Sequence, residues 1–123
     1  MERPVHFEIT ADNPEQAVKF YTKVFGWEIK KWEGPMEYWL VMTGPKEQPG
    51  IDGGLMRRSP PITTGTVNTV GVASLDESIK KVVDSGGKVV RPKSAVPGVG
   101  WFAYCADTEG NIFGMMQPDT SAK

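Results

Sequence analysis

The chain opens on an alternation of apolar and polar residues and then changes to helical spacing. Residues 5–10, VHFEIT, alternate as a half-buried strand does. Asn13 can cap a helix that begins at Pro14, and Gln16 completes a capping box. The apolar residues that follow recur on one helical face up to Gly26, a natural stop. The pattern predicts a strand followed by a helix.

The second half of the chain repeats this order. Residues 66–72, TVNTVGV, are a strand candidate, Ser74 and Glu77 supply a second capping box, and Gly87 is the expected helix stop. These cap and stop positions each lie 61 residues after their counterparts in the first half. Such agreement between independent signals predicts an internal structural repeat.

Three strand-like segments follow each predicted helix, and the last two repeat clearly. GIDGGLM at 50–56 matches GNIFGMM at 110–116, and aromatic-rich segments at 38–44 and 100–107 precede them. Neither half can bury both faces of its sheet alone, so we expect an α+β fold in which two tandem βαβββ modules form one curved, eight-stranded mixed sheet with helices outside. The expected divisions of this single domain, 1–123, are module one at 1–58, a linker at 59–65, module two at 66–118 and a short tail at 119–123.

Composition and charge limit the classes of function. Apolar residues make up 39% and charged residues 24% of the chain, which is ordinary for a soluble globular protein. The formal net charge of -1 and the scattered basic residues give no reason to bind nucleic acid or an anionic membrane. The absence of a long apolar run or an apolar signal core predicts a cytoplasmic protein with no membrane span. The lone Cys105 fits a reducing compartment and is expected to be a small core residue.

The sequence closely resembles the vicinal oxygen chelate superfamily, which includes glyoxalase, bleomycin-resistance proteins and extradiol dioxygenases. The resemblance is carried by HFEITADNPEQAVKFYTKVFGW at 6–27, above all by FYTKVFGW, and by DTEGNIFGMMQ at 107–117, which resembles the final turn and strand. It implies a cupped sheet around a ligand cavity, usually in a homodimer. It does not imply one activity, because this scaffold carries lyases, isomerases, dioxygenases and binders without chemistry.

The resemblance also locates the positions that hold a divalent cation in the metal-dependent relatives. Their ligands come from the first and fourth strands of each module. In this chain those positions are His6, Gly54, Val67 (or Asn68, if the register shifts by one) and Gly114. Only His6 is a competent ligand, and a divalent cation needs three or four nitrogen or oxygen donors. We therefore expect no metal and no cofactor.

Strand alternation predicts what faces the cavity instead. If His6 faces inward, Glu8 does too, while Phe7 and Ile9 pack under the helix. Glycines at the carboxylate positions leave volume for an organic ligand or mark a bulge. Aromatic residues of the middle strands are expected to form the walls of the cavity, although the sequence does not fix which of them face inward. The expected ligand-binding residues are His6, Glu8, Tyr38, Trp39, Asp52, Gly54, Met56, Trp101, Tyr104, Gly114 and Met116.

Two functions are consistent with this pattern. One is a metal-independent binder of a small organic molecule, acting as a homodimer. The other is a lyase or isomerase of the glyoxalase-like type in which His6 and Glu8 are the catalytic acid/base pair. A domain that acts only through protein contacts is a further alternative. Asp107 and Glu109, in the final turn, are expected to cap backbone NH groups.

Overall fold

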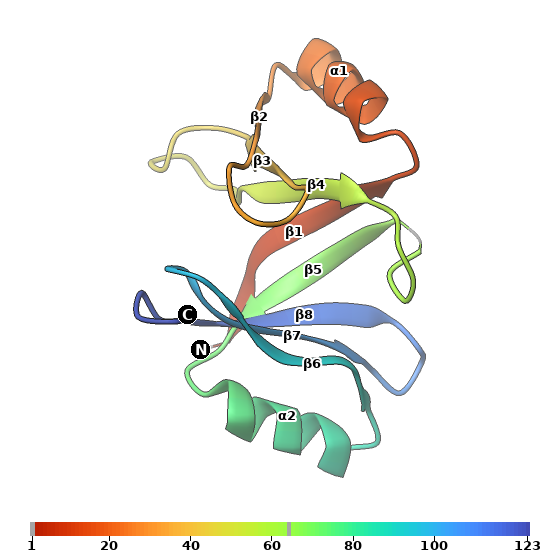
Figure 1. Ribbon diagram of the computed structural model, residues 1–123, viewed down its shortest axis with the longest axis vertical. Coiled ribbons are helices and arrows are strands. Elements are labelled where there is room, and N and C mark those ends of the chain that lie inside the picture. Colours follow the sequence, from red (N-terminus) through yellow and green to blue (C-terminus); the bar gives the residue numbers. More distant parts are fainter. Residues whose placement is uncertain (1, 64) are drawn as a thin grey trace. The chain divides into compact units, whose positions relative to one another are not determined.

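The computed structural model describes residues 2–63 and 65–123, and this part of the chain holds eight strands and two helices in the predicted order (Figure 1). The fold class is confirmed, because the strands form a mixed eight-stranded sheet. The elements are β1 (Arg3–Ala11), α1 (Pro14–Phe25), β2 (Glu28–Lys31), β3 (Trp39–Met42), β4 (Gly53–Arg57), β5 (Thr66–Gly71), α2 (Leu75–Asp84), β6 (Lys88–Val96), β7 (Gly100–Ala106) and β8 (Ile112–Pro118).

The chain divides into two compact units, His6–Thr66 and Val67–Lys123, the second of which also includes the residues up to Val5. Strand order in the first unit is β2-β3-β4-β1, with β1 and β4 parallel and the other pairs antiparallel. Strand order in the second is β5-β8-β7-β6, with β5 and β8 parallel. Each half of the chain therefore has the βαβββ pairing that the repeat predicts.

Both helices begin where the capping signals indicate. The side chain of Asn13 accepts a hydrogen bond from the backbone NH of Gln16 at 3.1 Å. The hydroxyl of Ser74 accepts one from the NH of Glu77 at 3.3 Å. These bonds satisfy NH groups that the first turn of a helix leaves unpaired.

The helix ends differ between the two units. Gly26 follows α1 with φ of 71°, the left-handed conformation that glycine adopts without strain. The predicted stop at Gly87 is wrong, because α2 already ends at Asp84 and Gly86 takes the positive φ, 95°. The repeat therefore holds at the caps and shifts by one residue at the stop.

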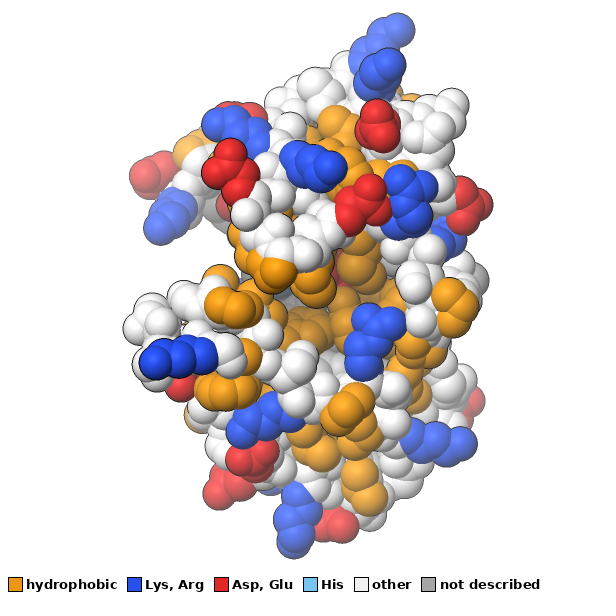
Figure 2. Space-filling model, in the orientation of Figure 1, with side chains coloured by type: hydrophobic (Ala, Val, Ile, Leu, Met, Phe, Trp, Pro, Cys, Tyr) orange, Lys and Arg blue, Asp and Glu red, His pale blue; other side chains and the backbone are white. Residues whose placement is uncertain are grey.

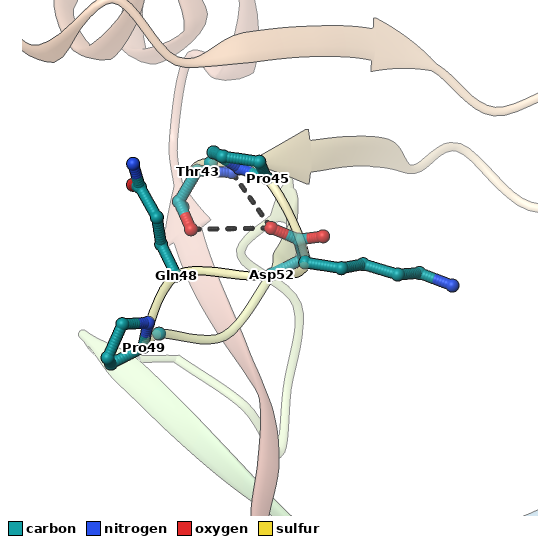
Figure 3. A pocket seen from close by; sticks show the side chains of 8 residues that line it. Thr43, Pro45, Gln48, Pro49 and Asp52 are labelled. Carbon is teal, nitrogen blue, oxygen red and sulfur yellow. Dashed lines mark hydrogen bonds between the residues drawn. The ribbon is translucent and has the colours of Figure 1, made fainter.

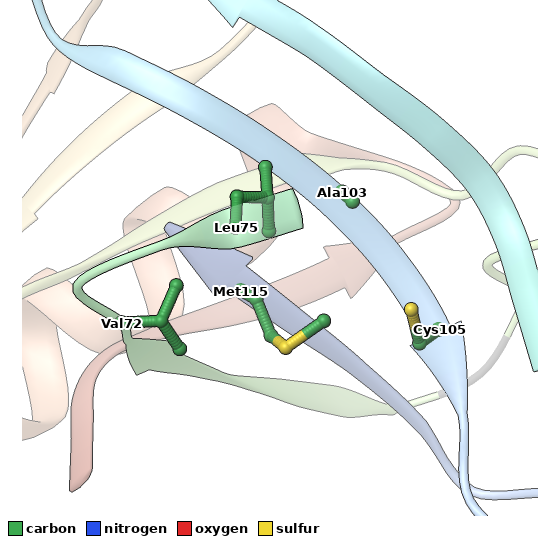
Figure 4. Packing of buried hydrophobic residues seen from close by; sticks show 5 residues of the cluster. All are labelled: Val72, Leu75, Ala103, Cys105 and Met115. Carbon is green, nitrogen blue, oxygen red and sulfur yellow. The ribbon is translucent and has the colours of Figure 1, made fainter. Parts of the chain in front are cut away.

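Each unit has its own core between its helix and its sheet. In the first, Trp39, Val41 and Leu55 are buried against residues of α1. In the second, the buried cluster comes from α2, the segment before it, β7 and β8, and comprises Val72, Leu75, Ala103, Cys105 and Met115 (Figure 4). Cys105 is thus a core residue, as predicted, and burial raises the pKa of its thiol.

The turn between β7 and β8 is held by Asp107. Its carboxylate accepts hydrogen bonds from the backbone NH groups of Glu109 at 2.8 Å and Asn111 at 2.9 Å, and from the Asn111 side chain at 3.0 Å. The Asn111 side chain, followed by these backbone groups, lowers the pKa of Asp107. The predicted capping role of Asp107 is confirmed.

Charged side chains of both signs share the face that Figure 2 shows, where basic side chains (blue) and acidic side chains (red) are interspersed. Several join in exposed ion pairs, such as Arg57 with Glu37 and Lys80 with Asp84. Neither helix of the described residues is long and apolar enough to cross a membrane.

Candidate functional site

The candidate site lies on the face of each unit's sheet opposite its helix, here termed the helix-free face. Alternate residues of the strands occupy it, because their neighbours pack toward the helices. In the first unit they are His6, Glu8, Thr10, Leu40, Met42, Gly54 and Met56, and in the second Val67, Thr69, Phe102, Tyr104, Gly114 and Met116.

A row of three hydrogen-bonded side chains crosses the helix-free face of the first unit. The Tyr38 hydroxyl lies 2.9 Å from Nε2 of His6 and donates a hydrogen bond of 2.8 Å to Oε2 of Glu8. His6 and Glu8 are both on β1, on the face that alternation predicts. The bridge between them is therefore a phenol that enters from the residue before β3.

Gly54 makes room for this phenol. On β4, Gly54 pairs with Glu8 on one side and with Leu40 of β3 on the other. A Cβ atom at position 54 would overlap the hydroxyl and ring carbons of Tyr38. The volume that the missing side chain leaves is thus occupied by Tyr38, where the sequence had suggested room for an organic ligand.

Tyr38 is held from the other side by Trp32, a residue that sequence reasoning did not select. The backbone NH of Trp32 donates to the carbonyl of Tyr38 at 2.7 Å, and the two rings meet edge to face with centroids 6.2 Å apart. A Cβ at Gly34 would overlap the Trp32 indole, so the connection between β2 and β3 folds back tightly over that ring. The G-P dipeptide at Gly34 is a turn signal, but no pattern in the sequence indicates the ring beneath the turn.

Burial governs the electrostatics of the row. Glu8 is only 5% exposed, and His6 is half-buried. Desolvation lowers the pKa of His6 and outweighs the opposing charges of Glu8 and Asp52. The imidazole is therefore neutral at pH 7. Since the single Tyr38 proton is donated to Glu8, the network assigns the imidazole proton to Nε2.

The lowered pKa of His6 has a consequence for stability. Between the folded and unfolded pKa values the unfolded chain binds more protons, so the free energy of unfolding should fall as the pH drops below about 6.5. Urea unfolding at pH 7.5 and 5.5 should show this loss in the native chain and a smaller one in His6→Gln. The only histidine of the chain can also be titrated directly by NMR. A midpoint above 6.5 would contradict the burial argument.

The second unit repeats the arrangement without its polar groups. Thr69 stands 61 residues after Glu8, and the Phe102 ring takes the place over Gly114 that Tyr38 takes over Gly54. The Phe102 ring also packs edge to face on Tyr104, with centroids 4.7 Å apart. Among the described residues, the buried Thr69 hydroxyl has no hydrogen-bond partner.

Two tryptophans predicted to line the ligand cavity belong to the cores instead. Trp39 is buried on the α1 side with Leu55, its partner across β3 and β4. Trp101 packs against the α2 core, and its indole NH donates to Asp119 at 3.0 Å. Strand parity, which the sequence left open, therefore places Phe102 and Tyr104 on the helix-free face.

Asp52 was also predicted to face the cavity from within a strand, but β4 begins at Gly53. Its carboxylate instead accepts hydrogen bonds from the backbone NH of Thr43 at 2.9 Å and the Thr43 hydroxyl at 3.3 Å. These bonds close the loop between β3 and β4 around a surface hollow of about 190 Å³, lined by residues 43–46, 48–50 and 52 (Figure 3). Asp52 thus organises a loop while contributing charge near His6.

The donor set does not fit a divalent cation. Gly54 and Gly114 bring no carboxylate, and Tyr38 already joins His6 to Glu8. Within the described residues, no three His, Cys, Asp or Glu side chains come together closely enough to hold a metal ion. A structural or catalytic metal site would need more donors than this.

Comparison with known sequences agrees with the observed fold. The sequence model described as "Glyoxalase/Bleomycin resistance protein/Dioxygenase superfamily" matches residues 3–115. Two curated proteins named "Putative glyoxylase CFP32", from Mycobacterium bovis and Mycobacterium tuberculosis, are 30% identical to the chain over 113 residues. The match covers 90% of this chain but 42% of each relative, so the chain spans less than half of their length.

Solved structures share the fold at low sequence identity. Hypothetical protein BH1468 from Bacillus halodurans superposes with a TM-score of 0.69 at 16% identity, covering 99% of this chain and 98% of its own. A variant of Streptomyces coelicolor methylmalonyl-CoA epimerase in complex with 2-nitronate-propionyl-CoA gives 0.69 at 14% identity, with 98% and 97% covered. The match to the family model, which runs through nearly every strand and both helices, settles the relationship: the chain belongs to the glyoxalase/bleomycin resistance protein/dioxygenase superfamily.

Proposed function

We propose that the chain binds a small organic molecule on its helix-free face without a divalent cation. The observation that carries this proposal is the Tyr38 hydroxyl, which lies over Gly54 and hydrogen-bonds both His6 and Glu8. A cation ligated by Nε2 of His6 would have to displace that hydroxyl, and a cation on either ring nitrogen would find too few further donors among the described residues. The phenol therefore satisfies both polar groups without a metal ion.

The remaining groups on this face suit an apolar ligand. Leu40 and Met42 are exposed there, at 41% and 36%, next to the polar row. Methionine adapts to ligands of different shape, and small-molecule sites combine apolar walls with a few polar groups. A solved structure of the same fold holds an acyl-CoA analogue, which supports an organic ligand. The helix-free face of the second unit carries apolar side chains of its own, Phe102, Tyr104 and Met116.

Binding can be tested by screening small planar and apolar compounds against the ¹⁵N-labelled protein. Ligands of the proposed kind should shift the amide resonances of Leu40 and Gly54 and the ring resonances of His6. Compounds that shift only resonances of the loop at 43–52, around its surface hollow, would count against the helix-free face.

Metal independence leads to a separate prediction. Addition of Zn²⁺, Ni²⁺ or Mn²⁺, or of a chelator, should leave the melting temperature unchanged within error, because a cation with no site gives no binding free energy to the folded state. Thermal melts over a concentration series measure this directly. A saturable rise in melting temperature that Glu8→Gln abolishes would overturn the proposal.

A lyase or isomerase is the second candidate, and the hydrogen-bonded row favours it. A neutral imidazole beside a buried carboxylate is a standard arrangement for moving a proton. If a substrate is found, a His6→Ala variant with full turnover would exclude it. The homodimer and the cytoplasmic location remain predictions from the sequence.

A further inference from the structure

The row His6–Tyr38–Glu8 has the connectivity of a proton wire with one open end. Nε2 of His6 donates toward Tyr38, Tyr38 donates to Glu8, and Nδ1 of His6 makes no hydrogen bond with any described residue. Nδ1 is therefore the unprotonated, basic atom of the row. It belongs to a half-buried side chain on the face proposed to bind a ligand.

We propose that these three residues form a metal-free proton relay in which Nδ1 of His6 removes a proton from an acidic C–H of a small apolar ligand, and the Tyr38 hydroxyl passes the Nε2 proton on to Glu8. This inference rests on the proposed binding function and adds a reaction to it. His6 is the catalytic base, and Tyr38 and Glu8 act through it as positioning residues.

Every proton that moves in this step is transferred from the ligand to the row or between members of the row. As Nδ1 gains the ligand proton, Nε2 gives its proton to the Tyr38 oxygen and the Tyr38 proton moves to Oε2 of Glu8. Imidazole and phenol end neutral, Glu8 becomes a carboxylic acid, and the negative charge passes to the ligand. Loss of the Glu8 proton through the same wire restores the starting state.

The surroundings hold the relay in place and favour this direction. Trp32 and the space at Gly54 fix the phenol between its two partners, so no rearrangement precedes transfer. Burial keeps the imidazole neutral before the reaction, and Glu8 and Asp52 are the charged groups that stabilise positive charge on it as the proton arrives. Leu40 and Met42 beside the row set the ligand class as apolar.

The experiment uses 5-nitrobenzisoxazole, a planar apolar compound that reports a base without needing the natural ligand. Removal of its C3 proton forms a nitrile, breaks the ring N–O bond and releases a coloured nitrophenolate. We expect the native protein to accelerate this opening, with a pH profile that follows deprotonation of His6. His6→Gln should lower the rate by about 10²-fold, within the usual contribution of a positioned base.

Tyr38→Phe and a matched control distinguish the relay from a simple exposed base. Tyr38→Phe keeps the ring over Gly54 but removes the wire, so the rate should fall and the inflection of the pH profile should move. The control adds Val83→His to His6→Gln, which returns an imidazole to an exposed position on α2. Its rate should stay at the His6→Gln level.

Binding of the same probe is measured from the shifts of the Leu40 and Gly54 amide resonances. If these shifts occur but the native protein and His6→Gln open the probe equally fast, the relay is wrong and the binding function stands. An unchanged rate and pH profile in Tyr38→Phe would also overturn the relay. Absence of any shift would reject planar apolar ligands and so remove the basis of both proposals.

Discussion

Replacing Gly54 by alanine is expected to lower the free energy of unfolding by about 1 to 3 kcal/mol, the usual cost of overpacking a filled site. The new methyl group would enter the space of the Tyr38 hydroxyl and ring. Backbone strain plays no part, since Gly54 does not have a positive φ. Relief requires Tyr38 to swing out, which breaks its hydrogen bonds to His6 and Glu8.

A double-mutant cycle with Tyr38→Ala identifies the cause of this loss. Once the phenol is absent, alanine at position 54 meets no ring, so Gly54→Ala should cost much less in the Tyr38→Ala background. Urea unfolding followed by tryptophan fluorescence measures all four proteins. Equal costs in both backgrounds would mean that Gly54 is needed for some reason other than room for Tyr38.

The fold could be predicted because its signals are local and occur twice. Asn13 and Ser74 cap their helices through a side-chain bond three residues along, a relationship that is fixed within one turn of chain. The alternation of His6 and Glu8 with Phe7 and Ile9 needs only the period of a strand. The helix stop at Gly87 was missed because two adjacent glycines, Gly86 and Gly87, could each take the left-handed conformation.

The site was less predictable because it depends on register between segments far apart in sequence. Tyr38 and Trp39 are adjacent, but Trp39 lies in the core and Tyr38 lies on the helix-free face. Only the pairing of Trp39 with Leu55 decides which of them enters the core. Asp52 lies one residue outside β4, so the alternation argument did not apply to it. That a phenol would cover Gly54 follows from the fold of the 32–38 connection, whose geometry no periodicity records.

The repeat nevertheless extends to the site itself. Tyr38 and Phe102 each stand two residues before the partner of a strand glycine, since Leu40 pairs with Gly54 and Tyr104 with Gly114. An aromatic ring covers the glycine in both units. The first unit adds a hydroxyl, and with it the bonds to His6 and Glu8, while in the second the Thr69 hydroxyl has no hydrogen-bond partner among the described residues. One scaffold position thus serves a polar row in one unit and simple packing in the other.

Because of this contrast, Gly114→Ala and Gly54→Ala should lower the free energy of unfolding by different amounts. The Gly114 variant should also lose stability, because its methyl group would meet the Phe102 ring and lie 3.0 Å from the Thr69 hydroxyl. The Phe102 ring has no hydrogen bond to lose, however, whereas displacing Tyr38 breaks its bonds to His6 and Glu8. At about 1 kcal/mol net for a typical bond, Gly54→Ala should be the costlier change by roughly 1 to 2 kcal/mol.

The same unfolding assay measures both variants, and Tyr38→Phe supplies the control. With the hydroxyl removed, the first unit has the same apolar ring over glycine as the second, so in that background Gly54→Ala should cost about as much as Gly114→Ala does in the native chain. If the difference between the two glycines persists without the hydroxyl, it arises from ring packing. In that case the bonds to His6 and Glu8 contribute little to stability.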